Sequence, residues 1–348
     1  MEHNIDRKEM LDLMLRPAFL VEDGIIRHVN PSAAHLLLNA GQAVLPLIRV
    51  GQEEYRQFQS GSLQLTLSLA DTDVSTTVIQ QGDGQIFLPD LQSMPEQFRS
   101  LSLAAMQLRE PLAALSILLE QNTNPDNAGM INRRLHQLLR VVTNMSDAAR
   151  FADPGACRKE YTEICGFLEE ILEKADTLMG HIHLSVERQL PRENIFTRLD
   201  REQLERSVYN LLSNAAKFAP ESGTVQVKLS RVGNKLQLSV QNKASHGLSD
   251  FYDQYLRQPT LEDPIHGLGL GMALVRSTAA NHGGALLIDH PSGTHTRVTM
   301  TLAIDQGKGD LVRSPILHLD YAGERDHGLL ELSDVLPAHL YAEESYFF

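Results

Sequence analysis

An alternating glycine run directly before an amphipathic helix is the feature that most constrains this chain. In the segment GLGLGMALVRSTAANHGG, Gly267, Gly269 and Gly271 precede apolar residues at helical spacing. Because glycine has no Cβ, the backbone can approach an anion closely, and the free amides of the first helical turn can donate to it. The pattern predicts a phosphate-binding loop and helix, although a flexible loop before an ordinary helix would have the same composition.

A second segment, NLLSNAAKF, places polar side chains on one helix face. Asn210, Asn214 and Lys217 are spaced by four and then three residues, so they share a face opposite the leucines. Carboxamide oxygens can ligate Mg²⁺, and an ammonium group suits a polyphosphate. The alternative is a solvated polar face, which describes most such triples.

In this order, the two segments resemble the ATP-binding domain shared by histidine kinases, type II topoisomerases and Hsp90-type chaperones. NLLSNAAKFAP is similar to the family's asparagine box and the glycine segment to its last glycine box, while Asp200 stands where the family often has an aspartate. The resemblance implies ATP and Mg²⁺ as cofactors, with Asn214 as the metal ligand. The implied cofactor-binding residues are Asn210, Asn214, Lys217, Asn242, Gly267, Gly269, Leu270 and Gly271.

One position distinguishes the histidine kinases of that superfamily from the members that hydrolyse ATP with water. Members that hydrolyse ATP with water usually carry a glutamate base four residues before the magnesium asparagine, and here that position is Asn210. An amide cannot accept a proton from water. The sequence therefore favours the histidine-kinase branch over the ATPase machines.

The segment AAMQLREPLAAL resembles the phosphoacceptor helix of histidine kinases, whose pattern reads His-Glu-Leu-Arg-Thr-Pro-Leu. Met106 stands in the place of the acceptor histidine, Gln107 replaces the neighbouring acid, and Glu110 replaces the residue that helps to position water. A thioether has no nucleophilic nitrogen, so we expect no autophosphorylation at this position. His136 is expected to be a partly exposed residue beside the helix seam, not a substitute acceptor.

The middle glycine box of the family is also altered. The family would show Asp-x-Gly-x-Gly, whereas this chain reads QNKASHGL, with Asn242 at the adenine-reading position and Ala244 in place of a glycine. A neutral amide oxygen accepts a weaker hydrogen bond than a carboxylate does. Nucleotide affinity is expected to be reduced or lost, and residues 251–266 are expected to form a short lid.

Residues 93–153 are predicted to form a helical hairpin, broken at 122–129. A hairpin cannot bury two apolar stripes alone, so we expect two copies to form a dimeric four-helix bundle. The alternative is a bundle within one chain, made with the N-terminal domain. The stripes are Leu101, Ala104, Leu108, Leu112, Leu115 and Leu119 in the first helix, and Ile131, Leu135, Leu138, Val142, Met145 and Ala149 in the second.

Residues 1–92 read as a small α/β unit. Short extended segments flank Asp23-Gly24, Asn30-Pro31 opens a helix, and alternating leucines at 63–69 predict a half-buried strand. This order resembles a PAS sensor domain. No haem-type or flavin-type ligand set is present in the sequence, so no cofactor is expected there.

Residues 158–304 alternate helix and strand, which predicts an α/β sandwich with an antiparallel or mixed sheet. Helices are expected at 164–179, 201–218 and 270–282, and a hairpin is expected across Gly233-Asn234. In the extension 305–348, the segments SPILHLDY and GLLELSDVLP are expected to be additional strands packed on this chain; the alternative is a motif that binds a partner. The chain is therefore predicted to be a multidomain α+β protein.

Composition narrows the function classes. The net charge of −13 leaves little basic surface for nucleic acid. No apolar run approaches the ~20 residues that span a bilayer, and the charged start lacks a signal core, so a cytoplasmic protein with two reduced cysteines is expected. We expect either a homodimeric histidine-kinase-like regulator that binds nucleotide as a switch, with a response regulator or kinase as partner, or an enzyme that phosphorylates a partner's histidine or serine.

Overall fold

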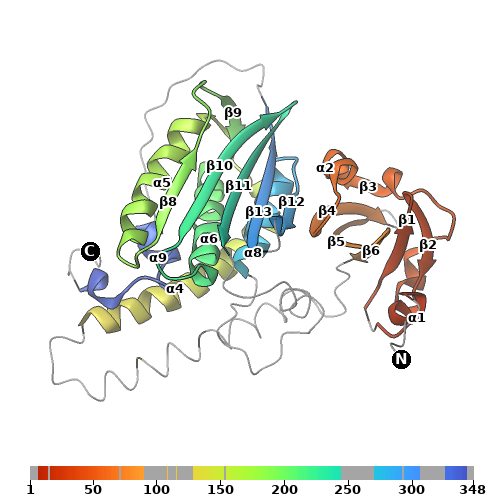
Figure 1. Cartoon of the computed structure of the whole chain (residues 1–348), viewed down its shortest axis with the longest axis horizontal. Helices are drawn as coiled ribbons and strands as arrows, with labels where there is room; N and C mark the ends of the chain where they lie inside the picture. The colour runs from red at the N-terminus through yellow and green to blue at the C-terminus, as the bar shows by residue number, and fades with distance from the viewer. Residues whose placement is uncertain are drawn as a thin grey trace.

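The computed structural model contains an N-terminal α/β unit, a long helix and a larger α/β unit (Figure 1). It describes residues 7–14, 16–69, 72–89, 108, 115, 128–152, 154–243, 270–291, 294–305 and 326–342. Among the described helices, none has both the length and the apolar character needed to cross a membrane. Cys157 and Cys165 are both free thiols.

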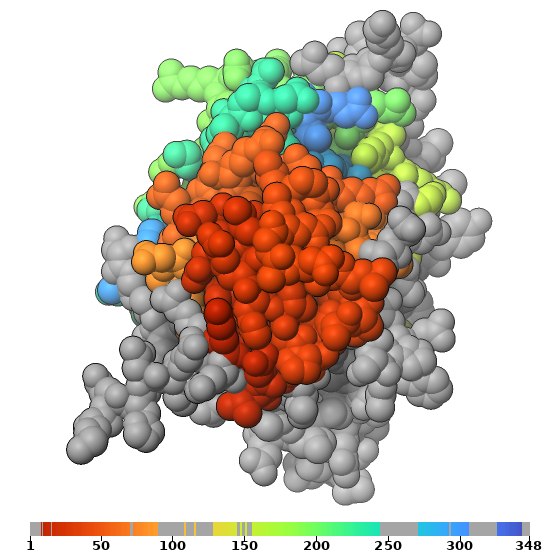
Figure 2. All heavy atoms as spheres, turned by 90° about the vertical axis from the view of Figure 1, so that its right-hand side faces the viewer, coloured from red at the N-terminus to blue at the C-terminus, as the bar shows by residue number. Residues whose placement is uncertain are grey.

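The N-terminal unit is an antiparallel sheet flanked by short helices; Figure 2 shows its outer face in front of the larger unit. Asn30 caps the expected helix by accepting from the Ala33 amide at 3.0 Å, but that helix is a 3₁₀ helix. The four alternating leucines of β4 are all buried, as expected. The elements are α1 (Arg7–Asp12), β1 (Phe19–Glu22), β2 (Ile25–Val29), η1 (Pro31–Leu36), η2 (Leu45–Leu47), β3 (Ile48–Val50), α2 (Gln52–Gln57), β4 (Ser62–Leu69), β5 (Thr72–Gln81) and β6 (Gly84–Pro89).

The larger unit has three helices packed on one face of a sheet, and β8 runs parallel to β10, so the expected mixed sandwich is confirmed. The expected hairpin forms across Gly233, and a separate two-stranded sheet pairs β7 with β9. The elements are β7 (Glu160–Glu163), α5 (Ile164–Gly180), β8 (Ser185–Gln189), β9 (Phe196–Leu199), α6 (Arg201–Phe218), β10 (Thr224–Val232), β11 (Lys235–Lys243), α8 (Leu270–Asn281), β12 (Leu286–Asp289) and β13 (His295–Ala303).

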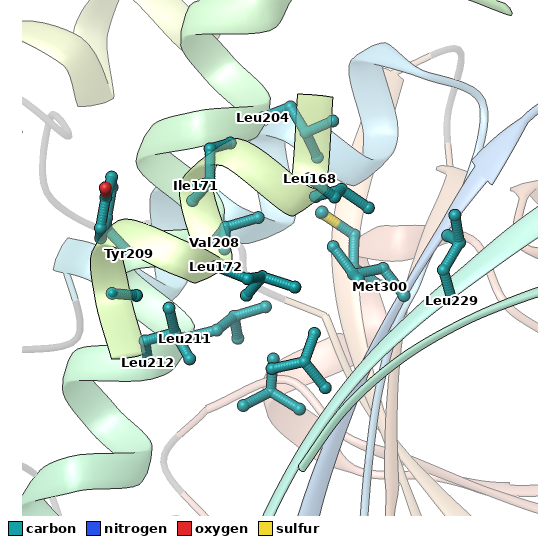
Figure 3. Packing of buried hydrophobic residues seen from close by; sticks show 14 of the residues in the cluster. Leu168, Ile171, Leu172, Leu204, Val208, Tyr209, Leu211, Leu212, Leu229 and Met300 are labelled. Carbon is teal, nitrogen blue, oxygen red and sulfur yellow. The ribbon is translucent and has the colours of Figure 1, made fainter. Parts of the chain in front are cut away.

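The core of the larger unit lies between the helices and the sheet. Helices α5 and α6 contribute leucines and isoleucine at helical spacing, and the strands meet them with buried aliphatic side chains. Burial of such side chains contributes about 1.5–3 kcal/mol each relative to exposure. Figure 3 labels Leu168, Ile171 and Leu172 of α5, Leu204, Val208, Tyr209, Leu211 and Leu212 of α6, Leu229 of β10 and Met300 of β13.

The two sheets join edge to edge. Strand β4 pairs antiparallel with β12, so that Leu63 lies opposite Leu287. Glu54, buried at this junction, lies 2.7 Å from Lys235 Nζ and accepts a 2.6 Å hydrogen bond from Thr301 Oγ1. This pairing covers one edge of each sheet and links the N-terminal unit directly to the larger unit.

Helix α4 (Ala128–Ala152) confirms the second helix of the expected hairpin, whereas the first helix lies outside the described residues except for positions 108 and 115. It packs against α8 and the C-terminal segment 326–342. From its polar face, the buried side chains of Arg140 and Asn144 contact Ser213 and Arg206 of α6. Of the expected seam, three residues are half-buried and Val142 is 51% exposed. The side chains of Met145 and Ala149 lie outside the described set.

The prediction of a strand at GLLELSDVLP is wrong. Residues 326–342, here called the tail segment, form α9 (His327–Glu331) and the 3₁₀ helix η6 (Ala338–Tyr341). Asp326 starts α9 by accepting from the amides of Gly328 and Leu329. The buried leucines of this segment then pack on the helices of the larger unit, so tertiary burial and a cap override the strand-like composition. The other segment, SPILHLDY, lies outside the described residues.

Ionisable side chains join α4, α6 and the tail segment, and we call the six among them that centre on Glu331 and Asp334 the charge network. Glu331, which is 0% exposed, lies 3.0 Å from Arg140 Nε and 2.7 Å from Arg206 Nε. Arg206 Nη1 lies 2.6 Å from Asp147 Oδ2, and Asp334 pairs with Arg140. The sixth member, Lys217, pairs with Asp334. Charges removed from water in this way are stable only while each has its counter-charge.

We predict that Glu331→Gln lowers the free energy of unfolding by about 3–5 kcal/mol, because it leaves Arg140 and Arg206 buried beside a neutral partner. Urea unfolding of the full chain, followed by circular dichroism, measures the change. The matched control is Asp73→Asn, which removes the exposed partner of Arg49 and should lower the free energy of unfolding far less. Equal losses in the two variants would contradict a stabilising role for the network.

Candidate nucleotide site

The asparagine segment lies on α6, and the start of that helix is fixed by Asp200. Its carboxylate accepts hydrogen bonds from the Gln203 amide at 3.0 Å and from the Arg158 amide at 2.8 Å. The expected aspartate before the helix is therefore an N-cap in this structure. The apolar face that follows orients α6 on the sheet and so determines where Asn210, Asn214 and Lys217 lie.

Asn210 is completely buried, so the alternative of a solvated polar face does not hold at this position. Its Nδ2 donates to the Arg206 carbonyl at 2.9 Å, while its Oδ1 accepts no hydrogen bond within the described residues. Gly271, in the first turn of α8, lies directly against this oxygen, and a Cβ there would collide with it. The predicted glycine helix and asparagine helix thus meet at an unsatisfied buried acceptor.

Asn214 and Lys217 lie further along the same helix face. Asn214 is partly exposed, and Lys217 Nζ lies 2.6 Å from Asp334 Oδ2 in the tail segment. Burial lowers the pKa of Lys217, an effect that Asp334 opposes. Burial would raise the pKa of Asp334, but Arg140 and Lys217 lower it to about 2. Asp334 therefore carries its negative charge near neutral pH and faces the Lys217 amine.

Helix α8 is held on α6 by buried polar contacts. The hydroxyls of Ser207 and Thr278 lie 2.9 Å apart, and both residues are fully buried. Beyond the helix, His282 Nε2 accepts from the Asp200 amide at 3.0 Å, so its Nδ1 carries the proton and donates to the Thr278 carbonyl at 2.7 Å. Burial lowers the pKa of His282, which therefore stays neutral and links both helices.

Asn242, at the expected adenine-reading position, lies near the end of β11. It is 5% exposed, and its Nδ2 donates to the Lys243 carbonyl at 3.0 Å. The structure therefore places this amide in the interior of the unit, between the paired strands β10 and β13.

Several expected functional positions lie outside the described residues. They are Met106, Gln107 and Glu110 of the degenerate acceptor segment, Gly267 and Gly269 of the glycine run, Ala244, and the lid at 251–266. Leu270 begins α8, although its side chain is not among those described. Within the described residues, no group of three or more His, Cys, Asp or Glu side chains could hold a metal ion.

His136 is buried, contrary to the expectation of a partly exposed residue. Its ring lies 4.9 Å from that of Tyr341, and its Nδ1 lies 2.9 Å from the Asn132 carbonyl. The seam pattern could not show this, because the covering residue belongs to the tail segment. A buried ring packed in this way is a structural residue in this conformation.

Sequence reasoning missed the charge network beside the site. Arg206 stands within the helix whose apolar face was identified, yet no local pattern marks it as buried. The carboxylate that meets Lys217 is 117 residues away along the chain. A signal did exist in the tail, where Glu331 and Asp334 interrupt an otherwise apolar run, as acids do when they face buried cations.

The residues present fit a magnesium–polyphosphate ligand. The observation that supports the fit is the buried Asn210 oxygen, which has no partner among the described residues, beside a helix start that a side chain at Gly271 would block. A buried acceptor of this kind costs free energy unless a ligand satisfies it. Lys217 adds a cation on the same helix face.

The chain matches known proteins over this region. Residues 199–306 match the family model for the histidine kinase-, DNA gyrase B- and HSP90-like ATPase. Sensor histidine kinase WalK of Bacillus subtilis is 21% identical over 263 residues, covering 68% of this chain and 43% of that protein. Sensor protein KdpD of Escherichia coli is 29% identical over 219 residues, covering 57% of this chain and 24% of that protein.

Solved structures of histidine kinases are also similar to the chain. Histidine kinase ThkA, in a complex with response regulator protein TrrA, is 13% identical with a TM-score of 0.45, and the match covers 85% of this chain and 97% of that chain. The chain spans less than half the length of WalK and of KdpD. Residues 199–306 therefore belong to the histidine kinase-, DNA gyrase B- and HSP90-like ATPase family, and a longer part of the chain is similar to sensor histidine kinases.

Proposed function

We propose that the chain is a two-component-type signalling protein that binds Mg·ATP as a switch and does not phosphorylate itself. The observation that carries the proposal is Asn210 Oδ1, a buried acceptor without a described partner against which Gly271 lies. Such an oxygen is suited to a metal ion, its water shell or a phosphate-bound group. The family membership of residues 199–306 supports ATP as the ligand.

In this proposal the chain's own residues divide the work of binding. Asn214 would hold Mg²⁺, and the buried oxygen of Asn210 would be a second acceptor next to it. Lys217 would pair its ammonium group with the phosphates. The amides around Gly267–Gly271 and the start of α8 donate to phosphate oxygens, and Asn242 accepts from the adenine amino group. Bound Mg·ATP supplies a phosphoryl group that could be transferred.

At two positions, the chain lacks a group that would transfer the phosphoryl group to water or to the chain itself. Asn210 stands where water-activating relatives have a glutamate, and an amide is not a general base. Met106 stands where the acceptor histidine would be, and His136 is buried against Tyr341. These substitutions favour a nucleotide-dependent switch over a self-phosphorylating kinase.

The remaining parts are assigned by the same proposal. Residues 1–92 form a PAS-like sensor, 93–153 a helical hairpin that pairs with a second copy in a four-helix bundle, 158–304 the ATP-binding domain, and 305–348 an extension. The dimer is supported by α4, whose polar face is buried on the larger unit while Val142 of its seam is 51% exposed. The partner would be a response regulator or a partner kinase.

A second candidate function is phosphoryl transfer to a histidine or serine of a partner protein. It is favoured by the retention of Asn214 and Lys217 on one helix face, since these would hold metal and phosphate whatever the acceptor. In that case the partner supplies the nucleophile and the base.

We predict that Asn242→Asp raises affinity for Mg·ATP about tenfold, because a carboxylate accepts a stronger hydrogen bond from the adenine amino group. Asn214→Ala should lower affinity at least about tenfold through loss of the metal ligand. Isothermal titration calorimetry of the full chain measures both, with Asn39→Ala, an exposed position on the N-terminal unit, as the control. No binding at millimolar Mg·ATP by wild type and Asn242→Asp alike would refute the nucleotide proposal.

We expect no acid-labile phosphate on the isolated chain after incubation with ATP labelled at the γ-phosphate, because Met106 cannot form a phosphoramidate. The same incubation with candidate partner proteins separates the two functions, since labelled partner would favour the kinase. Acid-labile label on the chain alone would overturn the proposal that it does not phosphorylate itself.

We predict a dimer at micromolar concentration in sedimentation velocity, and a monomer for Val142→Glu, because a charge on the seam cannot be buried between two copies. Val232→Glu is the matched control, since Val232 is similarly exposed at 44% but lies on the β10 strand, away from the seam. A wild-type monomer, or equal dissociation of both variants, would contradict the bundle.

A further inference from the structure

The tail segment meets the nucleotide site at one carboxylate. Asp334 Oδ2 lies 2.6 Å from Lys217 Nζ, and the same oxygen pairs with Arg140. Lys217 is the side chain that the proposed function assigns to the phosphates. In this conformation the ammonium group therefore already has an anionic partner, and that partner belongs to the protein itself.

The position of Asp334 is well determined by its surroundings. Arg133 of α4 donates to the carbonyls of Ser333 and Asp334 at 3.0 and 2.9 Å. Three residues earlier, Glu331 is completely buried between Arg140 and Arg206. Further on, the Tyr341 hydroxyl donates to the Leu329 carbonyl at 2.8 Å, which closes the tail segment on itself. The carboxylate is thus held beside Lys217 by contacts on both sides.

The charges of the network balance. Its three basic members, Arg140, Arg206 and Lys217, face its three acidic members, Asp147, Glu331 and Asp334. At the far end, Arg150 also pairs with Asp147 and with Glu202, which adds one basic and one acidic group. Removing the carboxylate of Asp334 leaves one positive charge uncompensated at the partly exposed end of the network. A polyphosphate is an anion that could take the same place, whereas it is repelled by the carboxylate while Asp334 remains there.

We propose that Asp334 competes with the nucleotide phosphates for Lys217, and that nucleotide binding in turn loosens the tail segment from α4. This inference rests on the proposed function, because it takes Lys217 as a phosphate ligand. The two equilibria are reciprocal: a carboxylate that weakens nucleotide binding is itself displaced more easily when nucleotide is bound. Arg133 and Arg140, which contact Asp334, both belong to α4. Displacement of Asp334 by nucleotide would therefore change the contacts of the long helix directly.

The test is Asp334→Asn in the full chain, which keeps the size of the side chain and removes its charge. Calorimetric titration with Mg·ATP should show binding tighter by on the order of tenfold. The gain in affinity should vanish in a Lys217→Met background, because Asp334 and the phosphates then have no ammonium group for which to compete. Glu221→Gln is the matched control, since it removes an exposed negative charge just beyond the end of α6 and should leave affinity unchanged.

A second measurement uses only the wild-type protein, so it does not depend on whether a variant folds. Hydrogen exchange of wild-type peptides from 326–342 should become faster at saturating Mg·ATP, while peptides from α5 should be unaffected. If wild type binds Mg·ATP but Asp334→Asn, folded by circular dichroism, binds no tighter, the inference is wrong and the nucleotide site stands. Unchanged exchange in the tail at saturation would also overturn it. If neither protein binds Mg·ATP, both the inference and the proposed function fail.

Discussion

The ion pairs of Glu331 with Arg140 and Arg206 are the interaction on which the arrangement of the larger unit depends. A carboxylate with no solvent exposure is stable only because two guanidinium groups, from α4 and α6, face it at 3.0 and 2.7 Å. Through this contact, three segments far apart in the sequence come to share one polar core. The orientation of the long helix, the course of the tail and the surroundings of Lys217 all follow from it.

The charge network determines which face of α4 is buried against the larger unit and which face stays accessible. Its polar side, with Arg140, Asn144 and Asp147, is buried against α6 and the tail, while part of its apolar seam stays accessible. The helix thus turns polar residues toward the larger unit and leaves apolar residues such as Val142 available for a further contact. The β4–β12 pairing, with Glu54 between Lys235 and Thr301, gives the N-terminal unit its own contact with the same domain.

Much of the fold could be predicted, because local patterns were strong where tertiary burial agreed with them. The helix 201–218 and the strand Ile25–Val29 match expectation, and the Gly233 turn joins the expected hairpin. The strand predicted at GLLELSDVLP failed, since the cap at Asp326 and burial of its leucines outweigh a β-like composition. At the site, the spacing of Asn210 and Gly271 marked them as candidates, but their direct contact is a tertiary fact.

The sequence by itself predicted the resemblance to histidine kinases, the nucleotide-type segments and a methionine at the expected acceptor position, because each depends on residue identity and short-range spacing. Only the tertiary structure decided that Asn210 is buried with an oxygen that has no partner in the described part of the chain, that His136 is covered by Tyr341, and that Lys217 meets Asp334. The physical reason is that burial and ion pairing depend on contacts between two residues, which belong to different parts of the chain. Where the partners are more than a hundred residues apart, no local periodicity records their meeting.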